Sequence, residues 1–293
     1  MNRIWALLAC LIIFPSAFLK AETYTVELGQ FEKLKINGNI RVVYSNLPDS
    51  TGYARYEAPF GSENFFDFVK KNDGSLKLQP SDENWGAADL PVVFLYSDFI
   101  SSIESYSELS VVAQSLTPCS SLTVKLIGNG SITIDNAKCT NINASITTGN
   151  GTINISGSCI NASFSMVGAG LISADRLVAE NVKCRILGTG SIGCWPVDNL
   201  SVTGLGSTKI YYKGKPNIKK TGGGKLLELP EDNVSTHSRQ GAELKSLSPV
   251  EEEVEEDDEE EIEKEDSFEE VEEVTAGDND EDFDYQTVVT DDD

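Results

Sequence analysis

The cysteines are the side chains of this 293-residue chain with the most distinctive spacing. Cys10 lies in an apolar N-terminal segment, so five cysteines, an odd number, remain after it. Cys119, Cys139 and Cys159 follow one another at a constant interval, which is also the period of a repeat described below. In a fold that repeats with this period, the three thiols would stack about 4.8 Å apart at a corner, the spacing of neighbouring strands. A disulfide between neighbours would be allowed, and a ladder of reduced, half-buried thiols is the interpretation that we favour.

The other two cysteines fit a core better than a reactive site. Cys184 and Cys194 alternate with polar neighbours and take positions that hydrophobic residues occupy elsewhere, so we expect both to be small core side chains. The five cysteines contain no Cys-x-x-Cys pair, and the single histidine, His237, lies far from them in the sequence. We therefore expect no metal site and no cofactor.

Two aspartates raise the alternative of carbohydrate hydrolysis. Asp135 and Asp175 stand at the same offset after the first glycine of a Gly-x-Gly pair. In stacked coils they would be about 10 Å apart, near the upper limit for the two carboxyl groups of an inverting glycosidase. Solvated turn carboxylates are the simpler interpretation, and we expect no catalytic residues.

The last five cysteines and these two aspartates lie within a sequence repeat that extends over residues 117–213. Successive first glycines of its Gly-x-Gly pairs are separated by steps of 21, 19, 20 and 16. A period of about 20 with alternating apolar and polar residues is typical of a β-solenoid. Glycine is favoured where each coil turns, so we expect both glycines of each pair to be structural turn residues. The pairs are Gly128/Gly130, Gly149/Gly151, Gly168/Gly170, Gly188/Gly190 and Gly204/Gly206.

Each repeat supplies two alternating segments, one before and one after its glycine pair. Their apolar positions predict two aliphatic columns that line one core, whereas the Ser, Thr, Asn and Lys residues between them face water. Before residue 117, alternation also predicts strands, and only residues 64–71 would suit a helical turn or two. The predicted inward residues include Leu122, Val124, Leu126, Ile132, Ile134, Ile142, Ala144, Ile146, Ile153, Ile155, Ala162, Phe164, Met166, Ile172, Ala174, Val182, Ile186, Ile192, Leu200, Val202, Thr208 and Ile210.

Several short sequences resemble one known family. They are Ile36-Asn-Gly-Asn-Ile40, Gly128-Asn-Gly-Ser-Ile132, Gly149-Asn-Gly-Thr-Ile153, Gly188-Thr-Gly-Ser-Ile192 and the closing Ile210-Tyr-Tyr-Lys-Gly-Lys-Pro216. Over residues 31–226 the chain is similar to the putative auto-transporter adhesin, head GIN domain family. The resemblance implies an exported bacterial protein with a right-handed β-helix fold and no established catalytic residues. The chain departs from the family pattern in its cysteines and in its acidic C-terminal segment.

Charge and hydropathy divide the chain into three parts. Residues 1–21 have the features of a signal peptide, residues 22–228 form the predicted domain, and residues 229–293 form a tail that we expect to be disordered. Residues 251–293 contain 25 acids and one lysine, which equals the net charge of −24 for the whole chain. Residues 1–250 are therefore neutral overall and have no basic surplus for nucleic acid.

These observations predict an all-β protein, a right-handed single-stranded β-helix followed by a disordered acidic tail. The predicted function is that of a non-enzymatic exported adhesin-like or envelope scaffold, which binds through a Ser/Thr/Asn-rich coil face. A carbohydrate-active β-helix enzyme and a purely structural envelope protein are the alternatives. We expect the protein in the periplasm or on the outer cell surface, with a carbohydrate or a cell-envelope protein as partner. We expect no nucleic-acid partner and no transmembrane helix in the mature chain.

The acidic segment allows a prediction about calcium. Nothing in residues 251–293 matches the alternating ligands and glycine of an EF-hand loop, so calcium should associate diffusely with exposed charges that salt screens. Isothermal titration of the full chain and of a chain ending at residue 250 measures this. A saturable, micromolar one-to-one isotherm that disappears on truncation would contradict the prediction.

Overall fold

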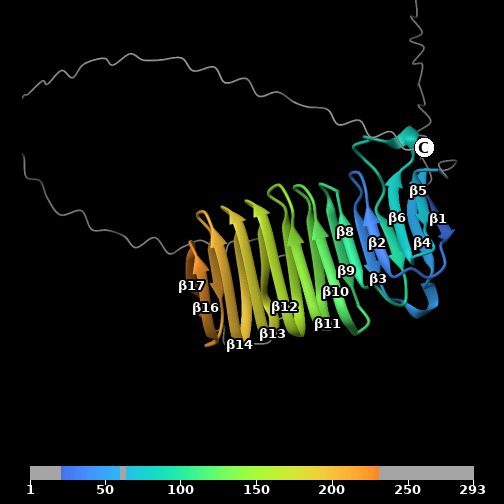
Figure 1. The fold of residues 1–293 in the computed structure, drawn as a ribbon. Helices are drawn as coiled ribbons and strands as arrows, with labels where there is room; N and C mark the ends of the chain where they lie inside the picture. Colours follow the sequence, from blue (N-terminus) through green and yellow to red (C-terminus); the bar gives the residue numbers. More distant parts are fainter. Residues whose placement is uncertain (1–20, 60–63, 231–293) are drawn as a thin grey trace, which may run out of the picture. The chain divides into compact units, whose positions relative to one another are not determined.

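A computed structural model describes residues 21–59 and 64–230 of the chain (Figure 1). The predicted signal peptide up to residue 20 and the acidic tail from residue 231 lie outside the described residues. The described part is nearly all β, with two short 3-10 turns, Pro48–Ser50 and Asp82–Asn84, and its strands stack into a β-solenoid of about 6 turns. None of the helices in this part of the chain is long and apolar enough to cross a bilayer.

Successive coils of the solenoid pair in parallel and in register. Each long strand follows a coil through three faces, which a β-bulge and a corner separate from one another. In β11 we name them the leading face (131–134), the middle face (137–139) and the trailing face (141–146), and the same names apply to the equivalent residues of other coils. The strands of this regular part are β10 (Cys119–Leu126), β11 (Ser131–Ile146), β12 (Thr152–Gly168), β13 (Leu171–Gly188) and β14 (Ser191–Leu205).

The core lies inside these three faces and confirms the predicted inward positions. Register pairs equivalent residues from coil to coil, as in Ile132 with Ile153 and Ile153 with Ile172. All of the predicted inward residues are buried, including Thr208 at the inward position before Ile210. Stacked side chains of similar size fill the interior of a narrow solenoid, so each coil buries its neighbour's apolar face.

The second Gly-x-Gly pair shows why glycine stands at the corners. Gly149 has a φ of +87°, which residues with a Cβ adopt rarely. Gly151 has no left-handed φ, but a Cβ there would lie 2.5 Å from the Leu126 side chain and 2.8 Å from the Gly128 carbonyl oxygen. One glycine therefore supplies the turn and the other supplies the close approach between coils.

The two glycines of a pair stand at the same corner but differ in backbone conformation. In the first four pairs the second glycines, Gly130, Gly151, Gly170 and Gly190, are buried and have no left-handed φ. They are glycines because the preceding coil leaves no room for a Cβ. A Cβ would collide with the Ser107 carbonyl oxygen at Gly130 and with the Met166 sulfur at Gly190, and at Gly170 it would lie 2.6 Å from the Gly151 carbonyl oxygen. In the fifth pair the order is reversed, because Gly206 has a φ of +99° and Gly204 has no left-handed φ.

The N-terminal end departs from simple sequential stacking. The first coil in the sequence, β2 with β3, is inserted between the coil of β6 and β7 and the coil of β8 and β9. Outside it, β1 pairs antiparallel with β4, β4 with β7, and β5 with β6, so antiparallel strands cover this end of the parallel stack. The strands are β1 (Ala21–Glu27), β2 (Lys33–Ile36), β3 (Val42–Ser45), β4 (Tyr53–Pro59), β5 (Phe66–Lys70), β6 (Ser75–Pro80), β7 (Val93–Tyr96), β8 (Ser102–Ser105) and β9 (Ser110–Gln114).

The helical interpretation of residues 64–71 is wrong. Phe66–Lys70 forms β5, which pairs antiparallel with β6 along its whole length. Phe66 packs edge-on against Tyr56 in the core, with ring centroids 5.2 Å apart. Tertiary pairing with β6 therefore overrides the helical spacing of the phenylalanines.

The C-terminal end is formed by β15 (Lys209–Tyr212), β16 (Asn217–Gly222) and β17 (Lys225–Glu228). A charged residue occupies one inward position of this last coil. Lys220 stands at the inward position that pairs with Val202. Its Nζ donates a hydrogen bond to the carbonyl oxygen of Gly224, at 2.6 Å. An inward charge at the last coil disfavours edge-to-edge addition of another β-structure.

The core register generates a stability prediction. Ile153→Asp places an unpaired carboxylate in the buried column, so we expect it to lower the free energy of unfolding by several kcal/mol. Thr152→Asp changes the neighbouring outward residue of the same strand and should cost within about 1 kcal/mol. Urea unfolding of both variants measures the difference, and equal losses would show that the inward register is wrong.

Candidate functional site

The three regularly spaced cysteines lie in one column of the middle face. Cys119 pairs with Cys139, and Cys139 pairs with Cys159. All three are free thiols; Cys119 is half-buried, and Cys139 and Cys159 are each 8% exposed. Burial and a hydrogen bond with Cys119 raise the pKa of Cys139 to about 12. Burial and the charge of Glu180 raise the pKa of Cys159 to about 11.

The other two cysteines contact each other inside the core. Cys184 on the trailing face and Cys194 on the leading face are both fully buried and free. A hydrogen bond with Cys194, together with burial, raises the pKa of Cys184 well above its ordinary value. Protonated, buried thiols are poor nucleophiles, so Cys139, Cys159 and Cys184 are suited to packing and not to catalysis.

The two aspartates are in different environments. Asp135 is exposed at its corner. Asp175 accepts a hydrogen bond of 2.8 Å from the Ser173 hydroxyl and lies 3.9 Å from the Nζ of Lys213. Lys213 is itself buried and lies over the ring of Trp195, 5.5 Å from its centroid. Asp175 is therefore part of a local ion pair that links the coils of β13 and β15 across the coil of β14. In residues 21–59 and 64–230, no group of three or more His, Cys, Asp or Glu side chains could hold a metal ion.

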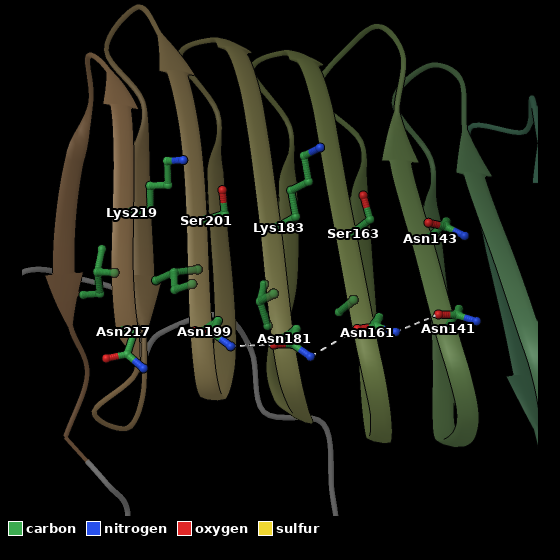
Figure 2. Close-up of a pocket in the computed structure, with 14 residues that line it drawn as sticks. Asn141, Asn143, Asn161, Ser163, Asn181, Lys183, Asn199, Ser201, Asn217 and Lys219 are labelled. Carbon is green, nitrogen blue, oxygen red and sulfur yellow. Dashed lines mark hydrogen bonds between the residues drawn. The ribbon is translucent and has the colours of Figure 1, made fainter.

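A groove of about 520 Å³ runs across several coils on the trailing face (Figure 2). Between its two polar columns lie the backbones of Ala162, Val182, Leu200 and Ile218; the first three side chains are buried in the core, and the Ile218 side chain is exposed in the last coil. Polar columns line it on either side, so that the groove crosses the strands of the sheet and follows the solenoid axis. The lining residues include neither an aspartate nor a glutamate. The two polar columns are Asn141, Asn161, Asn181, Asn199 and Asn217 on one side and Asn143, Ser163, Lys183, Ser201 and Lys219 on the other.

The asparagines at the corner form a hydrogen-bonded ladder along one side of the groove. The Nδ2 of Asn161 donates to the Oδ1 of Asn141 at 3.0 Å. Asn181 donates to Asn161 at 3.2 Å, and Asn199 donates to Asn181 at 2.7 Å (Figure 2). A side-chain amide has two N–H groups and an oxygen with two lone pairs. An asparagine inside the ladder uses one of each, which leaves one donor and one acceptor for water or a ligand.

The ladder has a signal in the sequence beyond the alternation of apolar and polar residues. The five asparagines from Asn141 to Asn217 recur once in every coil, each directly before an inward side chain. Turn chemistry alone explains asparagine at a corner, but it does not require the same corner in every coil. Recurrence in one column indicates stacked amides, as in asparagine ladders of other stacked β-structures.

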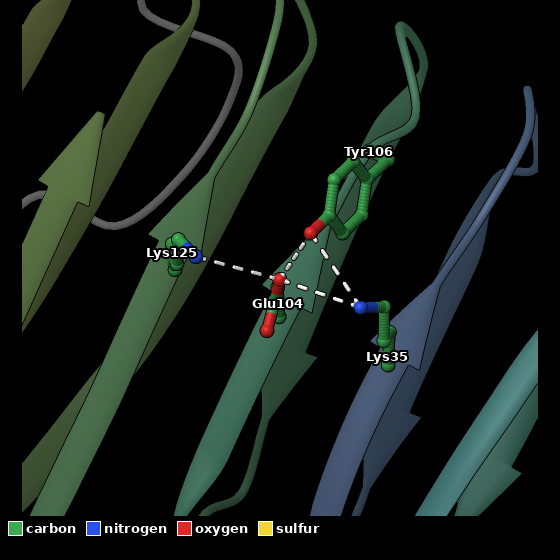
Figure 3. Close-up of polar contacts among 4 residues, drawn as sticks. All are labelled: Lys35, Glu104, Tyr106 and Lys125. Carbon is green, nitrogen blue, oxygen red and sulfur yellow. Dashed lines mark hydrogen bonds and ion pairs between the residues drawn. The ribbon is translucent and has the colours of Figure 1, made fainter. Parts of the chain in front are cut away.

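Further along the trailing face, Glu104 on β8 lies between two lysines (Figure 3). Its Oε1 is 3.7 Å from the Nζ of Lys35 on β2 and 3.6 Å from the Nζ of Lys125 on β10. It also accepts a hydrogen bond of 2.6 Å from the Tyr106 hydroxyl. Partial burial opposes ionisation, but the Tyr106 hydrogen bond and the charges of Lys125 and Lys35 hold the pKa of Glu104 below its usual value. One carboxylate therefore bridges cations from two neighbouring coils.

Because of the buried thiols, the free energy of unfolding should depend on pH in the alkaline range. A cysteine thiol ionises near its ordinary pKa of 9.0 in the unfolded chain, but Cys139, Cys159 and Cys184 stay protonated in the native state. The unfolded state therefore binds fewer protons above pH 9, and the free energy of unfolding should fall as pH rises from 8 to 10. Each thiol contributes at most about 1.4 kcal/mol per pH unit above pH 9.

Urea unfolding at pH 7, 8, 9 and 10 measures this loss. The matched control is the double variant Cys139→Ala and Cys159→Ala, in which the pH slope should be smaller because two of the three thiols are gone. An unchanged slope in that variant would contradict the assignment to these thiols.

The comparisons with known proteins agree with the solenoid and its repeats. Among solved structures, the chain resembles a putative adhesin from Bacteroides fragilis NCTC 9343, with a TM-score of 0.65, 21% identity, and coverage of 72% of this chain and 97% of that one. A putative adhesin from Parabacteroides merdae ATCC 43184 gives a TM-score of 0.55 at 19% identity, and a putative lipid binding protein from Parabacteroides distasonis ATCC 8503 gives 0.55 at 18%, each with the same two coverages. At these identities the likeness shows the fold.

The family comparison covers most of the solenoid. A search of curated proteins gives no match. The family model described as "Putative auto-transporter adhesin, head GIN domain" matches residues 30–216, which span β2 to β15. This match includes the inserted first coil and the closing Tyr-Tyr-Lys-Gly-Lys-Pro sequence. The chain therefore belongs to the putative auto-transporter adhesin, head GIN domain family.

Proposed function

We propose that the protein is an exported, non-enzymatic binding protein of the adhesin type, which holds a carbohydrate in the groove of the trailing face. The observation that carries this proposal is the groove itself, which lies between an amide ladder and a second polar column. Binding sites for small ligands commonly orient the ligand with a few precisely placed polar groups, and the hydrogen-bonded amides are such groups. The family description supports an adhesin-like function, and a place in the periplasm or on the outer surface is part of the proposal.

The ladder would hold the ligand-binding amides in fixed orientations. Each inner amide is held by its neighbours, so its remaining donor and acceptor are oriented before a ligand arrives. Pre-oriented groups lose little conformational freedom on binding, which favours affinity. The coil spacing of about 4.8 Å repeats these groups along the groove. A saccharide with hydroxyls along one edge matches the repeated amides and the polar side chains of the second column.

The lining of the groove supports binding over hydrolysis. Most glycoside hydrolases place two carboxyl groups on either side of the scissile bond. The groove is lined by asparagine, serine, lysine and apolar residues. Asp175, one of the two aspartates considered from the sequence, instead pairs with Lys213 and Ser173.

Filling the groove tests the proposal. Ser163→Trp places an indole among the groove-lining residues of β12, and we expect it to weaken retention on a bound polysaccharide at least tenfold. Ser158→Trp adds the same bulk to an exposed residue of the middle face of the same coil, and it should change retention less than twofold. The measurement is retention of both variants and of wild type on a panel of polysaccharides, with reducing-end release assayed in the same samples.

The outcomes separate the function classes. Retention without release, lost in Ser163→Trp alone, supports the binding protein. Release of reducing ends by wild-type protein would make the protein a carbohydrate-active enzyme. Retention equally affected by both tryptophan variants would contradict the placement of the site in the groove, and absence of retention on every polymer would favour a structural envelope protein.

A further inference from the structure

The trailing face is rich in basic residues, although the chain as a whole has a net negative charge. Its sheet runs in the order β6, β2, β8, β10, β11, β12, β13, β14 and β16. Two neighbouring columns of outward residues, each made of residues that pair from strand to strand, run across this sheet. Among their described residues, Glu104 is the one acidic side chain. The basic residues of the same two columns are Lys33, Lys35, Lys77, Lys125, Lys183, Arg185 and Lys219.

Glu104 neutralises little of this charge. It lies between Lys35 and Lys125, so one carboxylate serves two ammonium groups (Figure 3). Beyond this cluster, Lys183 and Arg185 on β13 and Lys219 on β16 make no ion pair with residues that the structure describes. Lys183, Arg185 and Lys219 are also exposed, and the first and last of them line the groove.

The other two faces have mixed charge. The leading face and its corner carry Asp135 and Asp175 together with Lys209 and Lys225, and the middle face carries Lys138 with Glu180 nearby. The neutral charge balance of residues 1–250 therefore conceals a basic trailing face. A surface of one charge sign attracts a partner of the opposite sign and raises its association rate.

From this segregation we infer that the ligand of the trailing face is an acidic polysaccharide, which lies along the solenoid axis across the coils. The inference rests on the proposed function and names its substrate class. Lys183, Arg185 and Lys219 bind the carboxylates of the polymer, and the asparagine ladder binds its hydroxyls. Because the exposed charges of this face are positive, its partner should be anionic, and the groove between the polar columns gives the polymer a path along the solenoid axis.

The spacing of the cations favours a polymer of moderate charge density over nucleic acid. Lys183 and Lys219 are two strands apart in one column, which corresponds to about 10 Å, and Lys125 and Arg185 are three strands apart in the next column, about 14 Å. Double-stranded DNA carries about one charge per 1.7 Å of its axis, far denser than this array. Single-stranded nucleic acids are held by aromatic side chains on which bases stack, and Tyr106, which projects near these columns, is already engaged by Glu104 and Lys35.

The experiment compares two triple variants of the full chain that lose the same three positive charges. The first, Lys183→Ser, Arg185→Thr and Lys219→Ser, copies the residue types of neighbouring coils into the trailing face. The control, Lys138→Ser, Lys209→Ser and Lys225→Ser, removes exposed lysines from the middle and leading faces. The immobilised probes are polygalacturonate and its methyl ester, which have the same backbone with and without carboxylate charge. Binding is measured at 50, 150 and 500 mM NaCl.

We expect wild-type protein to bind polygalacturonate at 150 mM NaCl and the ester at least tenfold more weakly. The trailing-face triple variant should lose at least tenfold in affinity for polygalacturonate, and the control variant should stay within twofold of wild type. Binding should weaken between 50 and 500 mM NaCl, because salt screens exposed charges. Matching thermal melts of the three proteins exclude loss of fold as the cause.

Three results would overturn the inference. Equal losses in the two triple variants would show a net-charge effect without a site. Equal binding of polygalacturonate and its ester, abolished by Ser163→Trp, would leave the groove as a saccharide site and remove the requirement for an acidic ligand. Binding that appears only after removal of residues 251–293 would assign the basic face of the full chain to its own acidic segment.

Discussion

Parallel pairing in register between successive coils is the interaction on which the rest of this structure depends. It satisfies the backbone hydrogen bonds of each coil and places equivalent residues above one another at about 4.8 Å. The aliphatic columns, the thiol column at Cys119, Cys139 and Cys159, and the asparagine ladder all follow from this one constraint. A shift of one residue in one coil would turn its inward side chains outward, so the core and the binding face are specified together.

The same constraint explains what could be predicted from the sequence. Alternation within residues 117–213 predicted inward residues such as Ile153 and Phe164, because a side chain in a strand points to one face or the other and glycine pairs mark each corner. The constant cysteine spacing likewise anticipated the neighbours of Cys139, since the coil length equals the sequence period. Where local pattern and tertiary pairing coincide, a single sequence is informative.

Other features depend on contacts that no local pattern encodes. The position of β2 and β3 between later coils depends on which strands they pair with, and not on their own sequence. Likewise, β5 is a strand because it pairs with β6. The separate roles of the two glycines in a pair depend on the coil beneath them, as the contact between Gly190 and Met166 shows.

The basic trailing face has no motif in the sequence. Its charges come from strands as far apart in the chain as β2 and β16, and each looks like an ordinary solvated lysine within its own strand. The column positions of Lys183 and Lys219 acquire meaning only once the strand order is known.

The most direct test of a binding face created by register is chemical footprinting of lysines in the full-length protein. Acylation of the amines, read by mass spectrometry, is compared with and without polygalacturonate. Shielding should be confined to the trailing face, at Lys125, Lys183 and Lys219, while Lys138, Lys209 and Lys225 react equally in both samples. Shielding spread evenly over these six lysines, or concentrated on the middle and leading faces, would contradict the account.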